Sequence, residues 1–358
     1  MSSRIIGYDP GTMFFQIAEK NKNGEITFKT IRNSFVEIQN YDTQDIEEIL
    51  KQNKWQYVTD GKHYYVIGDD SLSVSLIFPN VELRRPMQDG VLNKGEDKKM
   101  LIIAKIIESM IGENPVDSNS MVCFCTSGES IDNNVDDKFH RGRLQGVFER
   151  LGWNTKRIDE GLAVVLSERP LMVEKDGTEV PYTGIGISFG SGKVNMTLAY
   201  KGLPIISISS TRSGDYIDKM VSENTNMSLS QITHIKETKL DFSNIDYDDD
   251  VIFCLDVYYK NLIEYTFLNF NKRFQKVKSQ FSGPIDIVMA GGTASPPYFC
   301  DKVKSVIEGL DLPFEIREIK VSKDPRNAVV KGLLIQATIS SKRMKNKQKD
   351  ELDSIFGN

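Results

Sequence analysis

Residues 4–31, RIIGYDPGTMFFQIAEKNKNGEITFKTI, decide the fold. Three runs of apolar and β-branched residues in this stretch predict short strands, and the DPGT and NKNG segments between them predict tight turns. The same order returns in residues 183–209, TGIGISFGSGKVNMTLAYKGLPIISIS, where a glycine-rich turn follows the first strand. The six predicted strands cover residues 4–8, 13–19, 25–31, 183–187, 194–200 and 203–209.

The two stretches align with a constant offset. GYDPGT at 7–12 lies opposite GISFGS at 186–191, so the period of the repeat is 179 residues. This period is far longer than the roughly 20–50 residues of a solenoid repeat. It favours a duplicated domain with one copy in each half of the chain; the alternative is two unrelated three-stranded segments.

The segments between and after the repeats predict helices and two further strands, which indicates an α/β protein whose sheets are covered by helices. The predicted helices are 94–110, 136–151, 161–166, 214–221, 251–277 and 327–340, and the further strands are 122–126 and 285–290. We expect domain I over 1–178, with a small inserted subdomain at about 33–82; a C-terminal helix at about 325–345 completes this domain. We expect domain II over 179–324, with a subdomain at about 213–283. Residues 346–358 are expected to form a tail.

Composition narrows the classes of function. A formal net charge of −5 over 358 residues argues against a strongly basic nucleic-acid-binding protein. The four cysteines and three histidines lack the spacing of a metal site, and so few cysteines fit a reducing compartment. No apolar run approaches the ~20 residues of a membrane span. We therefore expect a cytoplasmic protein without a transmembrane segment, and neither membrane contact nor direct nucleic-acid binding is expected.

The turns are the candidate chemical sites, because tight turns expose backbone N–H groups that can hold phosphates. The DPGT turn at 9–12 and the GSGK turn at 190–193 occupy equivalent places in the two halves. Facing each other, they would clamp a nucleotide between two domains. Asp9 adds a carboxylate suited to hydrated Mg²⁺, and GGTA at 291–294 follows a buried strand, where backbone can approach a base closely. Either turn alone is equally typical of an ordinary hairpin.

The motifs, in the order in which they occur along the chain, resemble those of the actin superfamily. This superfamily also contains the large heat-shock chaperones and sugar kinases. Among its members the chain is most similar to the prokaryotic actins, MreB and the plasmid-segregation actins. RPMQDGV at 85–91 resembles the RPMKDGV segment of MreB and is the most specific match. The other matching segments are IGYDPGT at 6–12, DEGLAV at 159–164, ISFGSG at 187–192, SGDYID at 213–218, IKETKL at 235–240, MAGGTA at 289–294 and PRNAVVKG at 325–332.

The resemblance implies duplicated actin-like, RNase H-like domains of mixed sheets flanked by helices, with ATP or ADP and Mg²⁺ in the interdomain cleft. It implies that Asp9 orders Mg²⁺-bound water and that Glu160 polarises the attacking water, although Glu160 would equally suit a helix N-terminus. Catalytic roles are expected for Asp9, Glu160 and Ser188, and nucleotide-binding roles for Gly11, Thr12, Gly190, Ser191, Gly192, Lys193, Gly214, Lys236, Glu237, Gly291, Gly292 and Thr293.

Several positions depart from the family pattern. Thr126-Ser127-Gly128 replaces the Pro and Gly of the family's VPIG strand-turn. Ser188 stands where the second phosphate loop usually opens with Asp, and a neutral hydroxyl is a poorer partner for Mg²⁺ than a carboxylate. Lys193 stands where Thr or Asp is usual; it would place positive charge near a phosphate or point to solvent. We therefore expect slower hydrolysis than in typical actins.

The resemblance favours a protein that binds ATP, assembles head to tail into filaments and hydrolyses ATP slowly, with an adaptor protein as an additional partner. An open filament needs a heterologous contact that does not close into a ring. Two other functions are open: a catalytically impaired pseudo-actin scaffold, and a small-molecule kinase of the same fold. From the 358 residues we expect neither the long extra domain of the chaperones nor a sugar-binding segment.

Overall fold

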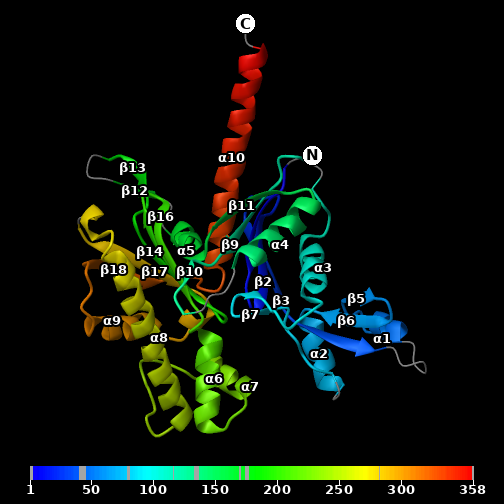
Figure 1. Cartoon of the computed structure of the whole chain (residues 1–358), viewed down its shortest axis with the longest axis horizontal. Coiled ribbons are helices and arrows are strands. Elements are labelled where there is room, and N and C mark those ends of the chain that lie inside the picture. Colours follow the sequence, from blue (N-terminus) through cyan, green and yellow to red (C-terminus); the bar gives the residue numbers. More distant parts are fainter. Residues whose placement is uncertain are drawn as a thin grey trace.

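The computed structural model describes residues 3–39, 46–78, 81–115, 117–132, 137–168, 171–173, 177–281 and 283–356. Its centre is a pair of mixed β-sheets, one in each half of the molecule, with helices packed against them (Figure 1). The α/β class predicted from the sequence is confirmed.

The two sheets share one topology. The first contains β1 (Ile5–Pro10), β2 (Phe14–Lys20), β3 (Ile26–Arg32), β9 (Met121–Thr126) and β11 (Asn154–Asp159), and the second contains β14 (Gly184–Phe189), β15 (Val194–Tyr200), β16 (Leu203–Ser210), β17 (Ile285–Ala290) and β18 (Ile316–Val321). In the first, β1 to β3 form an antiparallel meander, and β9 and β11 join β1 in parallel. The second sheet repeats this order and these directions, with a short strand β10 (Glu129–Ser130) added beside β16. The duplication predicted from the sequence period is therefore present in the fold.

The last helix of each half covers the sheet of the other half. Helix α5 (Glu160–Glu168) follows β11 but packs on β14, where a Cβ on Gly186 would lie 2.0 Å from the carbonyl oxygen of Gly161. Helix α10 (Ala328–Phe356) follows β18 but packs on β1, where a Cβ on Gly7 would lie 2.5 Å from the backbone of Leu334. Glycine is required at both strands because any side chain would push the helix away.

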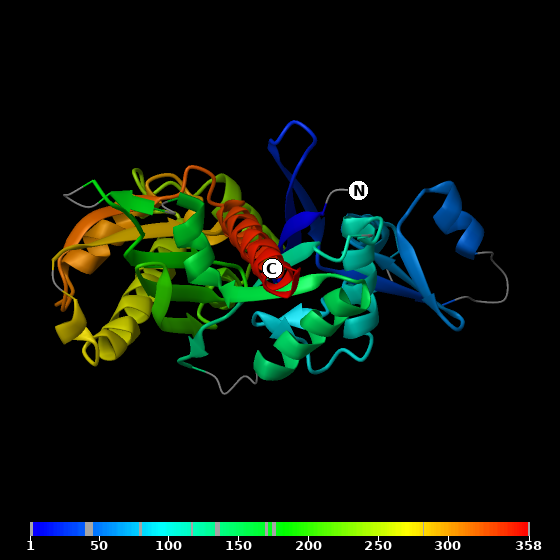
Figure 2. The same ribbon diagram turned by 90° about the horizontal axis from the view of Figure 1, so that it is seen from above.

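Helices α5 and α10 also pack on each other between the two sheets. A Cβ on Gly332 would lie only 1.8 Å from the carbonyl oxygen of Ala163, so the helix backbones touch. Buried small and aliphatic side chains surround this contact, among them Val164, Val329 and Leu333. Figures 1 and 2 show α10 running between the halves, with its C-terminal part projecting from the body. The helix predicted over 327–340 thus continues through residues expected to form a tail; residues 357 and 358 lie outside the described part.

The remaining elements lie around this frame. Domain I carries α3 (Lys99–Ile111), α4 (Asp137–Arg150) and a small outer sheet with two helices, visible at the right of Figure 2. These outer elements are β4 (Phe35–Gln39), α1 (Ile46–Gln52), β5 (Tyr57–Asp60), β6 (His63–Ile67) and α2 (Asp69–Ile77). Domain II carries α6 (Gly214–Thr225), α7 (Leu229–Thr238), α8 (Asp250–Phe274) and α9 (Phe299–Glu308). Short elements are β7 (Met87–Gln88), β8 (Val91–Leu92), β12 (Leu171–Val173), β13 (Glu179–Pro181) and the 3₁₀ turns Lys278–Gln280 and Gly292–Ala294.

Each half has its own apolar core. The larger core lies in domain II, where α8 places Leu255, Leu262 and Phe267 against the sheet; all three are fully buried. In domain I, the sheet packs against Ile103 and Ile107 of α3 and against α4. Within the described residues, the structure contains no helix that is both long and apolar enough to cross a membrane.

Candidate functional site

A cleft of about 970 Å³ lies between the two halves, within the range of roughly 300–1,000 Å³ that is usual for small-molecule sites. All but one of the predicted site residues line it. Gly214 does not, but it lies directly behind the wall, where a Cβ would be 2.4 Å from Thr293 Oγ1. The predicted residues that line the cleft are Asp9, Gly11, Thr12, Glu160, Ser188, Gly190, Ser191, Gly192, Lys193, Lys236, Glu237, Gly291, Gly292 and Thr293.

The first turn closes tightly after β1. A Cβ on Gly11 would lie 2.5 Å from the carbonyl oxygen of Phe14, so only glycine allows the chain to turn there. Asn33 Nδ2 donates a 3.0 Å hydrogen bond to the Gly11 carbonyl oxygen and holds the turn from β3's side. Thr12 is buried and presents its hydroxyl toward the other half of the molecule.

The second turn meets the first across the cleft. It is closed by a 2.9 Å hydrogen bond from the Gly190 N–H to the Lys193 carbonyl oxygen. A Cβ on Gly192 would lie 2.2 Å from Thr12 Oγ1 and 2.9 Å from the Gly90 nitrogen. The two turns therefore touch, and the absence of a side chain at Gly192 is what permits it.

The RPMQDGV segment supplies a third turn at this contact. Strands β7 and β8 pair as a two-stranded hairpin, and its turn residues Asp89 and Gly90 both have positive φ, 51° and 67°. Such turns favour Gly at the second position. The Gly90 N–H donates a 3.0 Å hydrogen bond to Thr12 Oγ1. The RPMQDGV segment, which is the most specific match to the family, thus forms a hairpin that holds the first turn in place.

Two carboxyl groups lie at the base of the cleft, where β1 and α5 come together. Asp9 accepts a 3.3 Å hydrogen bond from Cys125 Sγ. Glu160, at the start of α5, accepts a 2.7 Å hydrogen bond from Asn195 Nδ2 of β15. Burial raises the pKa of both carboxyls, and the charge of Asp9 raises the pKa of Glu160 further, while a hydrogen bond from Ser188 opposes this rise. The positive charge around Asp9 and Glu160 is therefore too small to offset the cost of burying both carboxyls in their ionised form.

Lys193 brings a cation to this region. Its side chain is buried, and Nζ donates a 3.1 Å hydrogen bond to Ser127 Oγ, just beyond β9 in domain I. The alternative in which Lys193 points to solvent is therefore wrong. Its charge opposes the rise in the pKa of Glu160. Burial and the same charge lower the pKa of the neighbouring His140 to about 3, so this imidazole is neutral at physiological pH.

The domain II wall is built from α6, α7 and the turn after β17. Lys236 Nζ lies 2.7 Å from Asp218 Oδ1 and donates a 3.1 Å hydrogen bond to the Gly214 carbonyl oxygen, so its ammonium is held within the wall. Glu237, the next residue, is exposed at the rim. The resemblance implied a nucleotide-binding role for both residues, but the structure gives them different surroundings.

The turn after β17 is shaped for close approach. Gly291 has φ 99°, and a Cβ there would lie 2.2 Å from the Phe189 carbonyl oxygen. Thr293 Oγ1 donates a 3.0 Å hydrogen bond to the Gly190 carbonyl oxygen and ties this turn to the second turn. Nothing lies within 4 Å of a Cβ on Gly292, which faces open space. Backbone is thus exposed beside the second turn.

The residues fit a phosphate-bearing ligand better than they fit a metal alone. Three glycine turns converge where phosphates would lie, and Lys193 adds a cation. In the described residues no group of three or more His, Cys, Asp or Glu side chains is placed to hold a metal ion. Asp9 is the carboxylate that could hold hydrated Mg²⁺, and Ser188 leaves the equivalent position of the second turn neutral.

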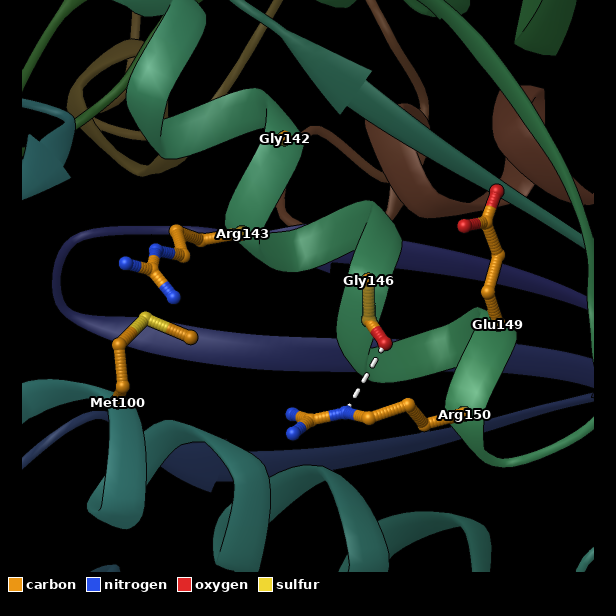
Figure 3. A pocket seen from close by; sticks show the side chains of 6 residues that line it. All are labelled: Met100, Gly142, Arg143, Gly146, Glu149 and Arg150. Atoms are coloured by element: carbon orange, nitrogen blue, oxygen red, sulfur yellow. Dashed lines mark hydrogen bonds between the residues drawn. The ribbon is translucent and has the colours of Figure 1, made fainter.

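A second hollow of about 570 Å³ lies between α3 and α4 and shares no lining residue with the cleft (Figure 3). Arg143 and Arg150 of α4 point toward Met100 of α3, and Arg150 Nε donates a 3.2 Å hydrogen bond to the Gly146 carbonyl oxygen. None of the residues predicted from the sequence lines this hollow.

Sequence reasoning missed several contacts of the site. Asn195 and His140 carry no motif that marks them, and Ser127 lies in a segment that departs from the family pattern. All three reach the site because distant elements pack together. Asp218 and Gly90 lie inside segments that resembled the family, but no role was assigned to them. The missed residues are partners of predicted residues: Asn195 of Glu160, Ser127 of Lys193, Asp218 of Lys236 and Gly90 of Thr12.

Solved structures share this fold over nearly the whole chain. The structure of the MamK double helical filament matches with a TM-score of 0.64 and 16% identity, covering 94% of this chain and 99% of that one. MreB5 of Spiroplasma citri bound to ADP matches with a TM-score of 0.63 and 14% identity, covering 96% and 99%. The AMPPNP-bound form of the same protein gives 0.63 and 13%, covering 97% and 99%. The chain therefore has an actin-like fold of the MreB and MamK type.

A family model described as Volactin matches residues 5–337. No curated protein matches the chain. The matched residues run from the first strand into the helix α10.

Proposed function

Because the chain belongs to the Volactin family and has an actin-like fold, we propose that it binds ATP in the interdomain cleft and assembles head to tail into filaments. One observation carries the proposal: the two glycine turns touch each other at the base of a single cleft, with Gly192 against Thr12. A ligand with a chain of phosphates would contact backbone N–H groups from both halves at once. Its binding would therefore set the angle between the halves.

Different residues of the cleft would bind different parts of the ligand. Turn residues Gly11, Thr12, Gly190 and Gly192 would hold phosphates, and Asp9 would hold hydrated Mg²⁺, which would help to neutralise the phosphate charge. The turn at Gly291–Thr293 and the rim of α7 would hold the nucleoside. The bound nucleotides of the MreB5 structures support this proposal.

Hydrolysis would depend on Glu160. Asn195 and Ser188 bind its carboxyl from domain II, and this fixes the group beside the phosphate turns. A carboxylate in this position can orient a water molecule for attack on the terminal phosphate. The raised pKa of Glu160 reduces the fraction of the carboxylate form, and the neutral Ser188 leaves Mg²⁺ with one carboxylate. Both features support slow hydrolysis.

Microscopy of the purified protein with ATP, with ADP and without nucleotide tests the assembly. We expect filaments with ATP and none without nucleotide, with light scattering giving the time course. A protein that stays monomeric in all three conditions at high concentration contradicts the proposal. Phosphate release, measured in the same samples, separates an ATP-hydrolysing filament from a pseudo-actin scaffold, which would assemble without releasing phosphate.

A further inference from the structure

The hollow between α3 and α4 lies outside the cleft and shares no lining residue with it (Figure 3). We propose that this hollow receives residues 246–248 of a second copy of the chain, Asp-Tyr-Asp, and that the contact joins copies during assembly. The inference rests on the proposed self-assembly and specifies two surfaces through which the copies meet.

The floor of the hollow is bare helix backbone. Gly142 and Gly146 lie four residues apart on α4 and therefore share one face of the helix. Nothing lies within 4 Å of a Cβ on either glycine, and Met100 of α3 forms the facing wall. The space of about 570 Å³ is within the roughly 300–1,000 Å³ that is usual for binding pockets. It leaves room for a large side chain of another molecule.

Two exposed guanidinium groups flank this floor. Arg143 lies over the ring of Phe139, 4.9 Å from its centroid, and Arg150 Nε donates its 3.2 Å hydrogen bond to the Gly146 carbonyl oxygen. Among the residues that the structure describes, neither arginine forms an ion pair with a carboxylate. Glu149 points away from the hollow (Figure 3). Because guanidinium groups bind carboxylates through two parallel hydrogen bonds, the hollow is suited to an acidic segment.

The chain carries such a segment immediately before α8. Asp246, Tyr247 and Asp248 are all exposed, and the side chain of Tyr247 is 68% accessible to solvent. The Asp248 N–H donates a 3.0 Å hydrogen bond to Asp246 Oδ1, which holds the segment in a tight turn. The Tyr247 ring packs edge-on against Phe253, with 6.2 Å between the ring centroids. In the described part of the chain, neither aspartate forms an ion pair. The turn therefore presents an aromatic ring between two carboxylates.

The two surfaces match in charge and in shape. Two carboxylates meet two guanidinium groups, and the tyrosine ring enters the space above the glycines, where arginine can stack on it. Arginine and tyrosine are also the residues that contribute most to binding at interfaces.

One molecule cannot bring its own two surfaces together. The hollow lies in domain I and the start of α8 lies at the far end of domain II, and the two are well apart in both views (Figures 1 and 2). The contact therefore joins different surfaces of two copies. Such a contact leaves a free hollow at one end of the assembly and a free acidic segment at the other, so further copies can be added.

The critical concentration for assembly with ATP, measured by light scattering, tests both surfaces. The double variants Arg143→Glu, Arg150→Glu and Asp246→Lys, Asp248→Lys should each raise it roughly tenfold or more, since both place like charges against each other. Wild-type assembly should also weaken with added salt. Nucleotide affinity should stay unchanged in both variants, because the hollow and the cleft share no lining residue.

A mixture of the two double variants is the sharper measurement. The arginine variant keeps an intact acidic segment, and the aspartate variant keeps an intact hollow. A one-to-one mixture should therefore form a complex of two chains that cannot extend, and sedimentation measures its mass. Damage to the fold would not be repaired by mixing.

Gly146→Gln fills the hollow without changing its charge. It should stabilise the fold, because glycine is a poor helix former, and yet raise the critical concentration roughly threefold or more. The matched control for the charge changes is Lys260→Glu, Lys304→Glu on the exposed faces of α8 and α9. This variant should assemble as the wild type does.

The inference is overturned if both charge variants assemble like the wild type, or if both fail and their mixture stays monomeric. It is also overturned if only the arginine variant is weakened, because the hollow would then bind a different acidic partner. In each of these cases the proposed filament remains. Wild-type protein that does not assemble with ATP would instead refute the proposed function, and the inference with it.

Discussion

The two halves of the molecule have one backbone plan and two sets of charges. In both, the first strand passes a glycine that touches the exchanged helix, Gly7 in one half and Gly186 in the other. At the end of this strand and in the turn that follows, the first half carries Asp9 and Thr12, whereas the equivalent positions of the second half are Ser188 and Ser191, and Lys193 ends its turn. The comparison teaches that the duplicated frame depends on close backbone contacts, while the charges that meet a ligand can be divided unequally between the copies.

The largest effect is expected where the halves are alike. Gly186→Ala and Gly7→Ala each place a methyl group against helix backbone, at 2.0 Å and 2.5 Å, so each should lower the free energy of unfolding by about 3–5 kcal/mol. Urea denaturation measures both. Gly142→Ala in α4, where nothing lies within 4 Å, should instead stabilise by about 0.5–1 kcal/mol. If only one of the two strand variants is destabilised, the equivalence of the halves fails.

The next effect concerns Glu160, whose carboxyl accepts hydrogen bonds from Asn195 and Ser188 of domain II. Glu160→Gln should slow phosphate release by roughly a hundred- to a thousandfold, as removal of one transition-state contact does, and leave nucleotide affinity nearly unchanged. Single-turnover phosphate release and equilibrium binding measure the two quantities separately. The control is Glu108→Gln on the exposed side of α3. An unchanged rate in Glu160→Gln would remove this residue from the proposed mechanism.

A smaller effect is expected in the pH dependence of the nucleotide-free protein. Because Asp9 and Glu160 have raised pKa values, the folded protein holds protons that the unfolded chain has already released. Stability should therefore fall as pH rises from the ordinary carboxyl range, near 4, through neutrality. Glu160→Gln should remove most of this slope and raise stability at pH 7.5 by about 1–2 kcal/mol. Thermal unfolding across the pH range measures it, and a wild-type curve that rises with pH would contradict the assignment.

The smallest effect is expected at the rim of the cleft, where an exposed ion pair joins the two halves. Arg85 Nη1 of domain I lies 3.2 Å from Asp215 Oδ2 of α6, and both side chains are more than a third exposed. A double-mutant cycle with Arg85→Ala and Asp215→Ala should give a coupling of about 0.2–1 kcal/mol that weakens with added salt. A coupling that does not respond to salt would show that the contact is more buried than the structure has it.

Sequence reasoning was most accurate where the pattern is local. All six strands of the repeat were found to within one or two residues, since alternating apolar residues and turn residues mark them. Strands β11 and β18 were missed because they lie at the edges of the sheets and consist largely of charged and polar residues, NTKRID and IREIKV. Edge strands need only one apolar face or none, so their sequence signal is weak.

The same limit applies to the site. The turn glycines could be predicted, because tight turns demand glycine wherever they occur. Asp9 could be predicted because its segment resembles the first phosphate loop of the family. The partners Asn195 and Ser127 could not, since each acquires its role by packing against an element far away in the sequence. The path of the Lys193 side chain depends in turn on Gly90 in the other half, because a Cβ there would lie 2.6 Å from Lys193 Cδ.

The last helix of each half covers the sheet of the other half, and this has a consequence for the synthesis of the chain. Strand β1 leaves the ribosome long before the backbone that covers it, at Val330 and Leu334 of α10. One face of the first sheet must therefore stay uncovered until α10 has been made, and such long-range closure is slow. A chain stopped before α10 would leave this face of β1 exposed, so only chains that include α10 can complete the packing of the first sheet.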